Sequence, residues 1–204
     1  MRCVIVAGAD IQNYDYVISQ LTDEDCFIYC DSGLRHREFL PKPNLIVGDF
    51  DSFALDKSEI ETIVLPMEKD DTDSVYAIKE ALKRGFKDIL LLGVVGNRLD
   101  HTLANLGALE YIYKHDAKGK IIDNYSEMEI VDSNVKEIDN KYAYFSLLNI
   151  YGEVMGINIS GAKYNLYDAT IKTDHQYAIS NEVKGDVARV SVDNGILLLI
   201  KILR

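Results

Sequence analysis

The sequence is short of cysteine and of long apolar runs. Its three cysteines, Cys3, Cys26 and Cys30, form an odd set. No second Cys or His pair complements Cys26 and Cys30, which argues against a structural zinc site. No stretch reaches the roughly 18 consecutive apolar residues of a membrane span, and the N-terminus lacks the features of a secretory signal. We therefore expect a cytoplasmic protein whose thiols are reduced.

Basic residues are also scarce. The chain has 22 Lys and Arg against 33 Asp and Glu, a formal net charge of −11. Nucleic acids and anionic membranes bind to a basic protein face that neutralises their phosphates, so this charge argues against both partners. An acidic chain still binds a polyphosphate when a divalent cation lies between them, and its charge suits a cationic small molecule.

The rest of the composition is that of a globular protein. Apolar residues make up 48% and charged residues 27% of a chain of 204 residues, long enough for one large domain or two small ones. Up to about residue 123, short β-branched runs alternate with stretches long enough for crossover helices, which predicts a mostly parallel, Rossmann-like α/β sheet. The expected strands are residues 2–7, 27–30, 45–47, 62–65, 88–92 and 120–123.

Residues 72–84 and 100–114 are expected to form helices, because apolar side chains recur in both at helical spacing. Thr72 and Asp100 are residue types that cap a first turn, and Gly85 follows the basic end of the first helix. In the second helix, the expected apolar face consists of Leu103, Leu106, Leu109 and Ile112.

After about residue 125, closely spaced strand-like runs with Gly, Asn and Asp between them replace this pattern. They predict a small all-β domain, a sandwich or barrel, whose last strands form a hairpin that turns at Asp193, Asn194 and Gly195. No Pro/Gly/Ser-rich linker intervenes, so we expect a rigid junction between domains of residues 1–124 and 125–204. The strand-like runs are residues 128–132, 143–150, 154–159, 176–180, 187–192 and 196–203.

The strongest local signal is the segment PNLIVGDFDS at residues 43–52. A buried strand is expected to end at Gly48, and Asp49 and Asp51 follow it. In a doubly wound sheet, ligands bind beyond the carboxyl ends of the strands. The alternative is that Gly-Asp and Asp-Ser only form turns here.

A second acidic segment, EKDDTD at residues 68–73, also follows a strand and opens a helix. Helix capping explains one or two carboxylates at such a place. Here Asp70, Asp71 and Asp73 are crowded together, and like charges about 4 Å apart repel by roughly 4 kcal/mol at an effective dielectric of about 20. A divalent cation would relieve this repulsion, so the segment favours a metal site.

The third segment, LGVVGNRLDH at residues 92–101, is a glycine-containing loop between a strand and a helix. Such loops direct backbone N–H groups towards a phosphate. The segment matches neither the Walker A motif nor the full dinucleotide fingerprint. Arg98 offers a donor fork for phosphate oxygens, although a surface ion pair is the usual role of such an arginine, and His101 is also explained as a partner of Asp100.

Three consecutive strand-to-helix junctions thus carry charged pairs, namely Asp49 and Asp51, Asp70 and Asp73, and Arg98 and Asp100. Helix capping alone would not be expected to place a charged pair at every one of these junctions. The pattern predicts a Mg²⁺-dependent polyphosphate site, in which carboxylates hold the cation and the cation bridges phosphate oxygens. Transferase chemistry follows from this site, but the acceptor does not.

These segments resemble, in the same order, the signature segments of thiamine pyrophosphokinases. The resemblance covers most of the chain and implies an α/β ATP-binding domain followed by a β-sandwich domain. It also implies a homodimer, with thiamine bound between the first domain of one subunit and the second domain of the other. The segments that carry it are residues 47–52, 69–73, 96–101, 161–166, 180–182 and 188–190.

The resemblance further implies a reaction in which the hydroxyethyl oxygen of thiamine attacks the β-phosphorus of Mg-ATP and AMP leaves. The implied catalytic residues are Asp49, Asp51, Asp70, Asp73 and Asp100, of which Asp49, Asp51 and Asp73 hold Mg²⁺. The implied ATP contacts are Asp31, Ser52, Lys69, Thr72, Gly96 and Arg98, and the implied thiamine contacts are Ser180 and Asn181.

Three loops depart from the usual pattern of this family. Residues 7–10 read AGAD where a Gly-Gly pair is typical, residues 30–33 read CDSG in place of Ala-Asp-Gly-Gly, and Asn97 stands where a second Gly is frequent. Tyr164 is more typical of strand core than of a ring stacked on thiamine. Two other functions also fit the acidic motifs: a phosphatase or nucleotidyl-sugar transferase, and a dimeric thiamine or nucleotide sensor without catalysis.

Overall fold

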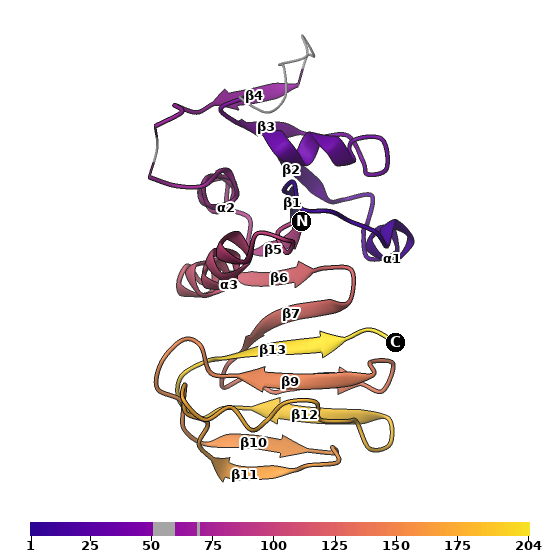
Figure 1. The fold of residues 1–204 in the computed structure, drawn as a ribbon, viewed down its shortest axis with the longest axis vertical. Coiled ribbons are helices and arrows are strands. Elements are labelled where there is room, and N and C mark those ends of the chain that lie inside the picture. Colours follow the sequence, from indigo (N-terminus) through magenta and orange to yellow (C-terminus); the bar gives the residue numbers. More distant parts are fainter. Residues whose placement is uncertain (51–59, 69) are drawn as a thin grey trace. The chain divides into compact units, whose positions relative to one another are not determined.

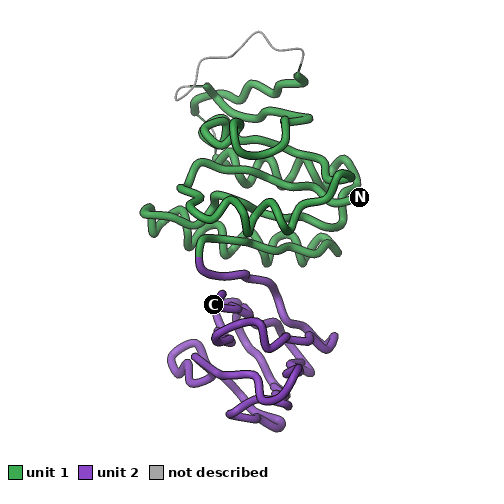
Figure 2. The backbone as a smooth tube through the Cα atoms, turned by 90° about the vertical axis from the view of Figure 1, so that its right-hand side faces the viewer, with its two compact units in different colours: residues 1–124 green, residues 125–204 purple. Residues whose placement is uncertain are grey.

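A computed structural model describes residues 1–50, 60–68 and 70–204. These residues form two compact units, Met1–Asn124 and Tyr125–Arg204 (Figure 2). The boundary falls where the sequence changes from alternating strands and helices to closely spaced strands. Three of the implied site residues, Asp51, Ser52 and Lys69, lie outside the described residues.

The first unit is built on a parallel sheet in the order β4-β3-β2-β1-β5-β6 (Figure 1). Its central strands are continuous apolar runs, as strands buried on both faces require. The strand predictions for this unit are confirmed to within two residues at each end. The strands are β1 Cys3–Val6, β2 Cys26–Cys30, β3 Leu45–Gly48, β4 Glu61–Val64, β5 Asp88–Leu92 and β6 Lys118–Ile122.

Helices cover both faces of this sheet. Helix α2, Asp73–Lys83, packs on β1, β2 and β3, while α3, Leu99–Lys114, packs on β6 and on α2. On the other face, α1 (Tyr14–Ser19) and the 3-10 helix η1 (Asp31–His36) contribute to the hydrophobic core. Figure 1 shows α2 and α3 on one side of the sheet and α1 on the other. Among the described residues, no helix combines the length and the apolar character of a membrane span.

The predicted ends of α2 are confirmed, whereas the predicted cap of α3 is wrong. Thr72 Oγ1 accepts a hydrogen bond from the Val75 N–H at 3.4 Å, and Gly85 follows the helix with a φ of 88°. In α3, Asp100 lies within the first turn, and it is Arg98 that precedes the helix. Asp100 cannot cap because its backbone is already helical there.

The predicted apolar face of α3 is right only for its second half. Leu109 and Ile112 are buried, but Leu103 is 58% exposed. The buried face instead runs through Asn105 and Ala108, which places a polar side chain against the rest of the unit.

The second unit is a sandwich of two antiparallel strand groups, β7-β13-β9 and β11-β10-β12-β8. Both groups contribute to one core, with Phe145 and Leu199 from the first and Ile159 and Val190 from the second. The prediction of an all-β sandwich is therefore confirmed. The strands are β7 Ser126–Val131, β8 Lys136–Asp139, β9 Tyr144–Leu148, β10 Ile157–Ser160, β11 Leu166–Ala169, β12 Val187–Ser191 and β13 Leu197–Ile202.

The predicted terminal hairpin is wrong. Strand β12 pairs with β8 and β10, whereas β13 pairs with β7 and β9, so the chain crosses between the two strand groups. The backbone of Asn194 bonds to that of Met155 at 3.0 and 3.2 Å, which directs the chain away from β12. Residues 176–180 do not form a strand either, although the Leu147 N–H of β9 donates to the Ala178 carbonyl at 2.8 Å.

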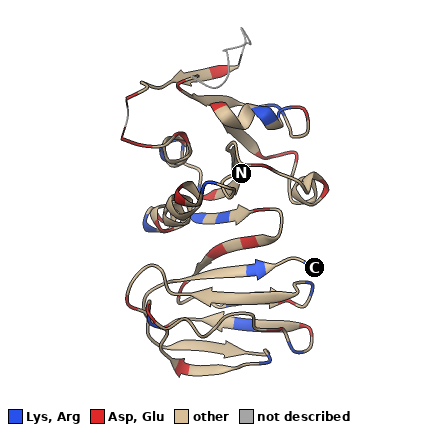
Figure 3. Cartoon of the chain, viewed as in Figure 1, with Lys and Arg blue, Asp and Glu red and all other residues tan. Residues whose placement is uncertain are grey.

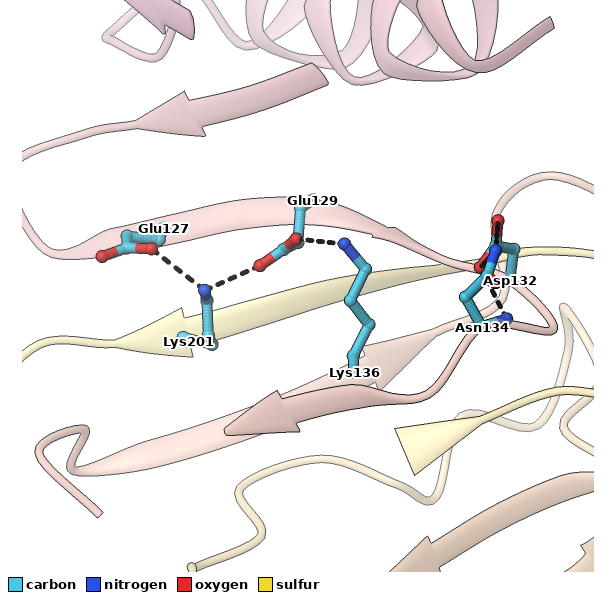
Figure 4. A network of polar contacts seen from close by, with 6 residues as sticks. All are labelled: Glu127, Glu129, Asp132, Asn134, Lys136 and Lys201. Atoms are coloured by element: carbon cyan, nitrogen blue, oxygen red, sulfur yellow. Dashed lines mark hydrogen bonds and ion pairs between the residues drawn. The ribbon is translucent and has the colours of Figure 1, made fainter. Parts of the chain in front are cut away.

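Charged side chains occupy part of the interior of this sandwich. The Lys201 ammonium nitrogen lies 3.0 Å from Glu127 Oε2 and 2.7 Å from Glu129 Oε1 (Figure 4). Lys136 of β8 reaches Glu129 Oε2 at 2.7 Å, and the Tyr142 hydroxyl donates to Glu127 at 2.8 Å. Figure 3 shows acidic positions on β7 beside a basic one on β13. Burial acts to raise the pKa of Glu129, but Lys201 and Lys136 outweigh it and hold that pKa below its ordinary value.

Candidate active site

The strand order of the first unit indicates where its site lies. The order reverses between β1 and β5, and in doubly wound sheets the crevice beyond the carboxyl ends of the strands at this point is where ligands bind. A cavity of about 380 Å³ opens there. Its walls come from residues 7–10 after β1, residues 93–98 after β5, and the beginnings of η1 and α2.

Three carboxylates converge in the same region. Asp31 begins η1 directly after β2, Asp49 follows β3, and Asp73 begins α2 and lines the cavity. One carboxylate oxygen of each lies within 4.8 Å of the other two. Gly48 permits this approach, because a Cβ at that position would lie only 2.5 Å from the Asp31 Cβ. The ends of two neighbouring strands and the start of a helix therefore present one acidic cluster.

The cluster has the chemistry of a site for a hard divalent cation. Asp31 is buried, and Asp49 and Asp73 are half-buried, so water screens their mutual repulsion less than at an open surface. Carboxylate oxygens are the ligands that Mg²⁺ takes in proteins, usually one or two of them together with phosphate oxygens. The donor set fits Mg²⁺ with room for a polyphosphate in the adjoining cavity.

A buried chain of hydrogen bonds ties the start of α2 to the loop after β5. Ser74 Oγ lies 3.0 Å from Thr72 Oγ1 and donates to Asn105 Oδ1 at 3.0 Å. The Asn105 amide in turn donates to the Val94 carbonyl at 2.8 Å. Asn105 thereby connects both walls of the cavity. Asn105 is the polar residue on the buried face of α3, and the apolar face predicted from the sequence did not include it.

Replacing Asn105 by alanine is expected to lower the free energy of unfolding by about 1–3 kcal/mol, because it leaves the Val94 carbonyl and the Ser74 hydroxyl without this partner. Urea denaturation followed by circular dichroism measures the loss. Ser74→Ala removes the contacts to Thr72 and Asn105 but keeps the hydrogen bond from Asn105 to the buried Val94 carbonyl, so it should cost less. A smaller loss for Asn105→Ala than for Ser74→Ala would contradict this account of the network.

Arg98 lines the cavity but is bound to Asp100. The guanidinium contacts both carboxylate oxygens, at 2.9 and 2.6 Å, and the two side chains are 70% and 64% exposed. These hydrogen bonds hold the pKa of Asp100 well below its ordinary value. His101 lines the same cavity. The surface ion pair is thus the arrangement that Arg98 adopts.

The remaining predicted nucleotide residues are divided between the cavity and the surface. Thr72 and Gly96 line the cavity, and the Gly96 N–H donates to Thr102 Oγ1 at 3.2 Å. Asp70 is exposed, and the described carboxylates that meet in the cluster do not include it. Its neighbour Asp71 binds Lys79 at 2.6 Å on the surface.

The predicted thiamine residues lie in the second unit. Ser180 is exposed and takes a left-handed φ of 57°. Asn181 is buried, and its side chain both donates to the Tyr164 carbonyl at 2.7 Å and accepts from the Tyr164 N–H at 3.0 Å. These bonds hold Tyr164 at the surface, where its side chain is exposed. The expectation that Tyr164 belongs to the strand core is therefore wrong.

An α/β unit with carboxylates gathered at the carboxyl edge of its sheet, joined in sequence to a β-sandwich unit, fits a two-domain enzyme that binds a phosphate substrate through a divalent cation. The family model described as thiamin pyrophosphokinase, catalytic domain, matches residues 18–121. The model described as thiamin pyrophosphokinase, vitamin B1 binding domain, matches residues 130–197. The chain belongs to the thiamin pyrophosphokinase family, which confirms the resemblance seen in its motifs.

Individual relatives agree with this assignment. The chain is 28% identical over 162 residues to Thiamine pyrophosphokinase of Bacillus subtilis, an alignment that covers 76% of each protein. The solved structure of Thiamine pyrophosphokinase from Bacillus subtilis superposes with a TM-score of 0.89 at 24% identity, covering 100% of this chain and 99% of that one. For Thiamin pyrophosphokinase from Geobacillus thermodenitrificans the TM-score is 0.85 at 25% identity, with 100% and 98% covered. The phosphatase, sugar-transferase and sensor alternatives are not favoured by these matches.

Proposed function

We propose that this protein is a thiamine pyrophosphokinase that transfers the pyrophosphoryl group of Mg-ATP to the hydroxyl of thiamine and releases AMP. The observation that carries the proposal is the convergence of Asp31, Asp49 and Asp73 beside the cavity at the switch point of the parallel sheet. Phosphoryl transfer depends on positioning and on stabilising charge, and this region of the fold supplies groups for both.

Asp31, Asp49 and Asp73 are the residues that would hold Mg²⁺. The bound cation would neutralise the charge of the phosphate chain. The loops after β1 and β5 form the walls that bind and orient the nucleotide. Asn105 keeps the second of these loops in register with α2, and hence with Asp73.

We further propose that thiamine binds to the second unit and that two copies of the chain form a homodimer that completes the thiamine site. The thiazolium ring of thiamine is a cation, and exposed tyrosines such as Tyr144, Tyr164 and Tyr177 offer aromatic faces for cation–π contacts. Ser180 lies next to Asn181, which holds Tyr164 in place. Light scattering would measure the oligomeric state.

A direct assay tests the proposed reaction. Purified protein with Mg²⁺, ATP and thiamine is expected to release AMP and form thiamine pyrophosphate in a one-to-one ratio, and to release no AMP when thiamine is omitted. Both products are quantified by chromatography. Hydrolysis of a phosphomonoester without any thiamine-dependent AMP would instead support the phosphatase alternative.

Replacing Ser180 by alanine is expected to raise the KM for thiamine by about tenfold, the loss of one hydrogen bond in a desolvated site, and to leave the KM for ATP unchanged. Steady-state kinetics with each substrate varied in turn gives both constants. Ser133→Ala, at an exposed position of the same unit, provides the matched control. An equal rise in both KM values for Ser180→Ala would argue against a thiamine site in the second unit.

A further inference from the structure

Two arginines line the cavity of the first unit, and they come from different walls. Arg98 precedes α3, whereas Arg35 belongs to η1, the helix that begins with Asp31 of the acidic cluster. Of these two arginines, the family resemblance implies only Arg98 as an ATP contact. A nucleoside triphosphate carries several negative charges. Of the two guanidinium groups, the one that gives up its present partner at lower cost should therefore contribute more to nucleotide affinity.

The two guanidinium groups differ in how fully their charge is already neutralised. Arg98 holds both oxygens of Asp100 in a two-pronged contact at 2.6 and 2.9 Å. Arg35 makes one hydrogen bond to the carbonyl of Gly8, at 3.0 Å, and lies 3.3 Å from one oxygen of Asp10. A neutral carbonyl and a single, longer carboxylate contact are weaker partners than a bidentate carboxylate, so Arg35 gives them up at lower cost.

The backbone that carries Arg35 is fixed against the same loop. Burial lowers the pKa of His36 and so favours its neutral ring. The Ala9 carbonyl can only accept, so His36 Nε2, 3.1 Å away, carries the ring proton, and in the neutral ring Nδ1 accepts from the Tyr14 hydroxyl at 2.7 Å. Tyr14 also stacks on Phe39, with ring centroids 4.6 Å apart. Loop residues 7–10, η1 and α1 are thereby held together, and the position of Arg35 is set before any ligand binds.

We propose that Arg35 is a phosphate-binding residue of this site and contributes more to nucleotide affinity than Arg98. On binding, its guanidinium exchanges Asp10 for oxygens of the triphosphate while its backbone remains anchored through His36. The inference rests on the proposed function only in taking ATP as the ligand.

The test is a titration calorimetry measurement of ATP binding to the full chain, without added metal and again with Mg²⁺. Arg35→Gln is expected to weaken ATP binding by about 10- to 100-fold, the range for a charge-assisted hydrogen bond. The fold-loss of ATP affinity in Arg98→Gln should be at least about threefold smaller than the fold-loss in Arg35→Gln. Arg37→Gln, an exposed arginine of the same segment that does not line the cavity, is the matched control and should bind ATP like the wild type. Thermal melts verify that each variant is folded, and Arg35→Lys, which keeps the charge but loses the fork, should fall between wild type and Arg35→Gln.

Inorganic tripolyphosphate, used as a competitor of ATP, locates the contact. If Arg35 binds the phosphate chain, Arg35→Gln weakens tripolyphosphate by a factor similar to that for ATP. An Arg35→Gln protein with wild-type ATP affinity, or one weakened no more than Arg98→Gln, overturns the inference, as does a loss confined to ATP. A wild-type chain that binds ATP through Arg35 but forms no AMP with thiamine would refute the proposed function and leave the inference standing.

Discussion

Replacing Asp73 by asparagine is expected to reduce turnover at least about a thousandfold, the effect of roughly 4 kcal/mol on the barrier when a ligand of a catalytic cation is lost. Asp73 supplies one of the three carboxylates that meet within 4.8 Å, and it alone of the three also lines the cavity wall. Asparagine keeps the size of the side chain and removes its charge. The rate of thiamine-dependent AMP release measures the effect.

The same variant should remain folded, because Asp73 is half-buried and begins a helix that Thr72 still caps. Asp88→Asn is the matched control: Asp88 is exposed at the amino end of β5, the opposite edge of the sheet from the cluster. It should turn over substrate like the wild type. Turnover by Asp73→Asn within tenfold of the wild type would mean that the acidic cluster does not hold the catalytic cation.

Replacing Lys201 by methionine is expected to lower the free energy of unfolding by about 3–5 kcal/mol, since it leaves the buried Glu127 carboxylate without a cation and Glu129 with Lys136 alone. The side chains of Lys201 and Glu127 are only 7% and 1% exposed, so water cannot substitute for the lost partner. Methionine retains most of the apolar stem, which separates the loss of charge from the loss of packing. Urea denaturation at pH 7 gives the difference.

A surface pair of the same length provides the control. Lys163 and Glu182 are 2.7 Å apart, the same distance as Lys201 and Glu129, but their side chains are 48% and 43% exposed. Lys163→Met should therefore change stability by no more than about 1 kcal/mol. Similar losses for the two variants would contradict the role assigned to burial.

The pH dependence of the Lys201 variant follows from the direction of the pKa shift at Glu129. A carboxyl whose folded pKa is lowered adds stability that is present above its ordinary pKa and is lost as the pH falls through the lowered value. Without Lys201 this contribution shrinks, and a protonated carboxyl no longer needs a cation. The gap between wild type and Lys201→Met should therefore narrow below about pH 4, and a gap that widens there would contradict the assignment.

Most of the fold follows from periodicity. The strands β1, β2, β3 and β5 are largely apolar runs bounded by polar turns, because their faces are buried on both sides of the sheet. Helix α2 is marked at both ends, by Thr72 and Gly85. The crossing between β12 and β13 is different, because the residues around Asn194 fit a hairpin equally well and the pairing with Met155 depends on a segment far away in the sequence.

The site shows a similar division. Asp49 and Asp73 stand out in the sequence because of where they lie. Asp49 follows a strand and Asp73 begins a helix, and both positions are at the carboxyl edge of the sheet. Asp31 is equally placed, after β2, but it stands alone in its segment and has no second carboxylate to mark it. Arg35 and Arg98 differ in which carboxylate each contacts and at what distance. The sequence alone does not give these contacts.

Strand β13 lies between β7 and β9, although it is the last of these strands to be synthesised. On the ribosome, β7 and β9 emerge without the strand that joins them, and the backbone N–H and C=O groups that pair with β13 stay without these partners until residues 197–202 leave the exit tunnel. A nascent chain halted before Leu197 consequently has its second unit divided through the middle. This unit can acquire its native sheet only after β13 has left the exit tunnel, whereas the strands of the α/β unit are complete at Ile122.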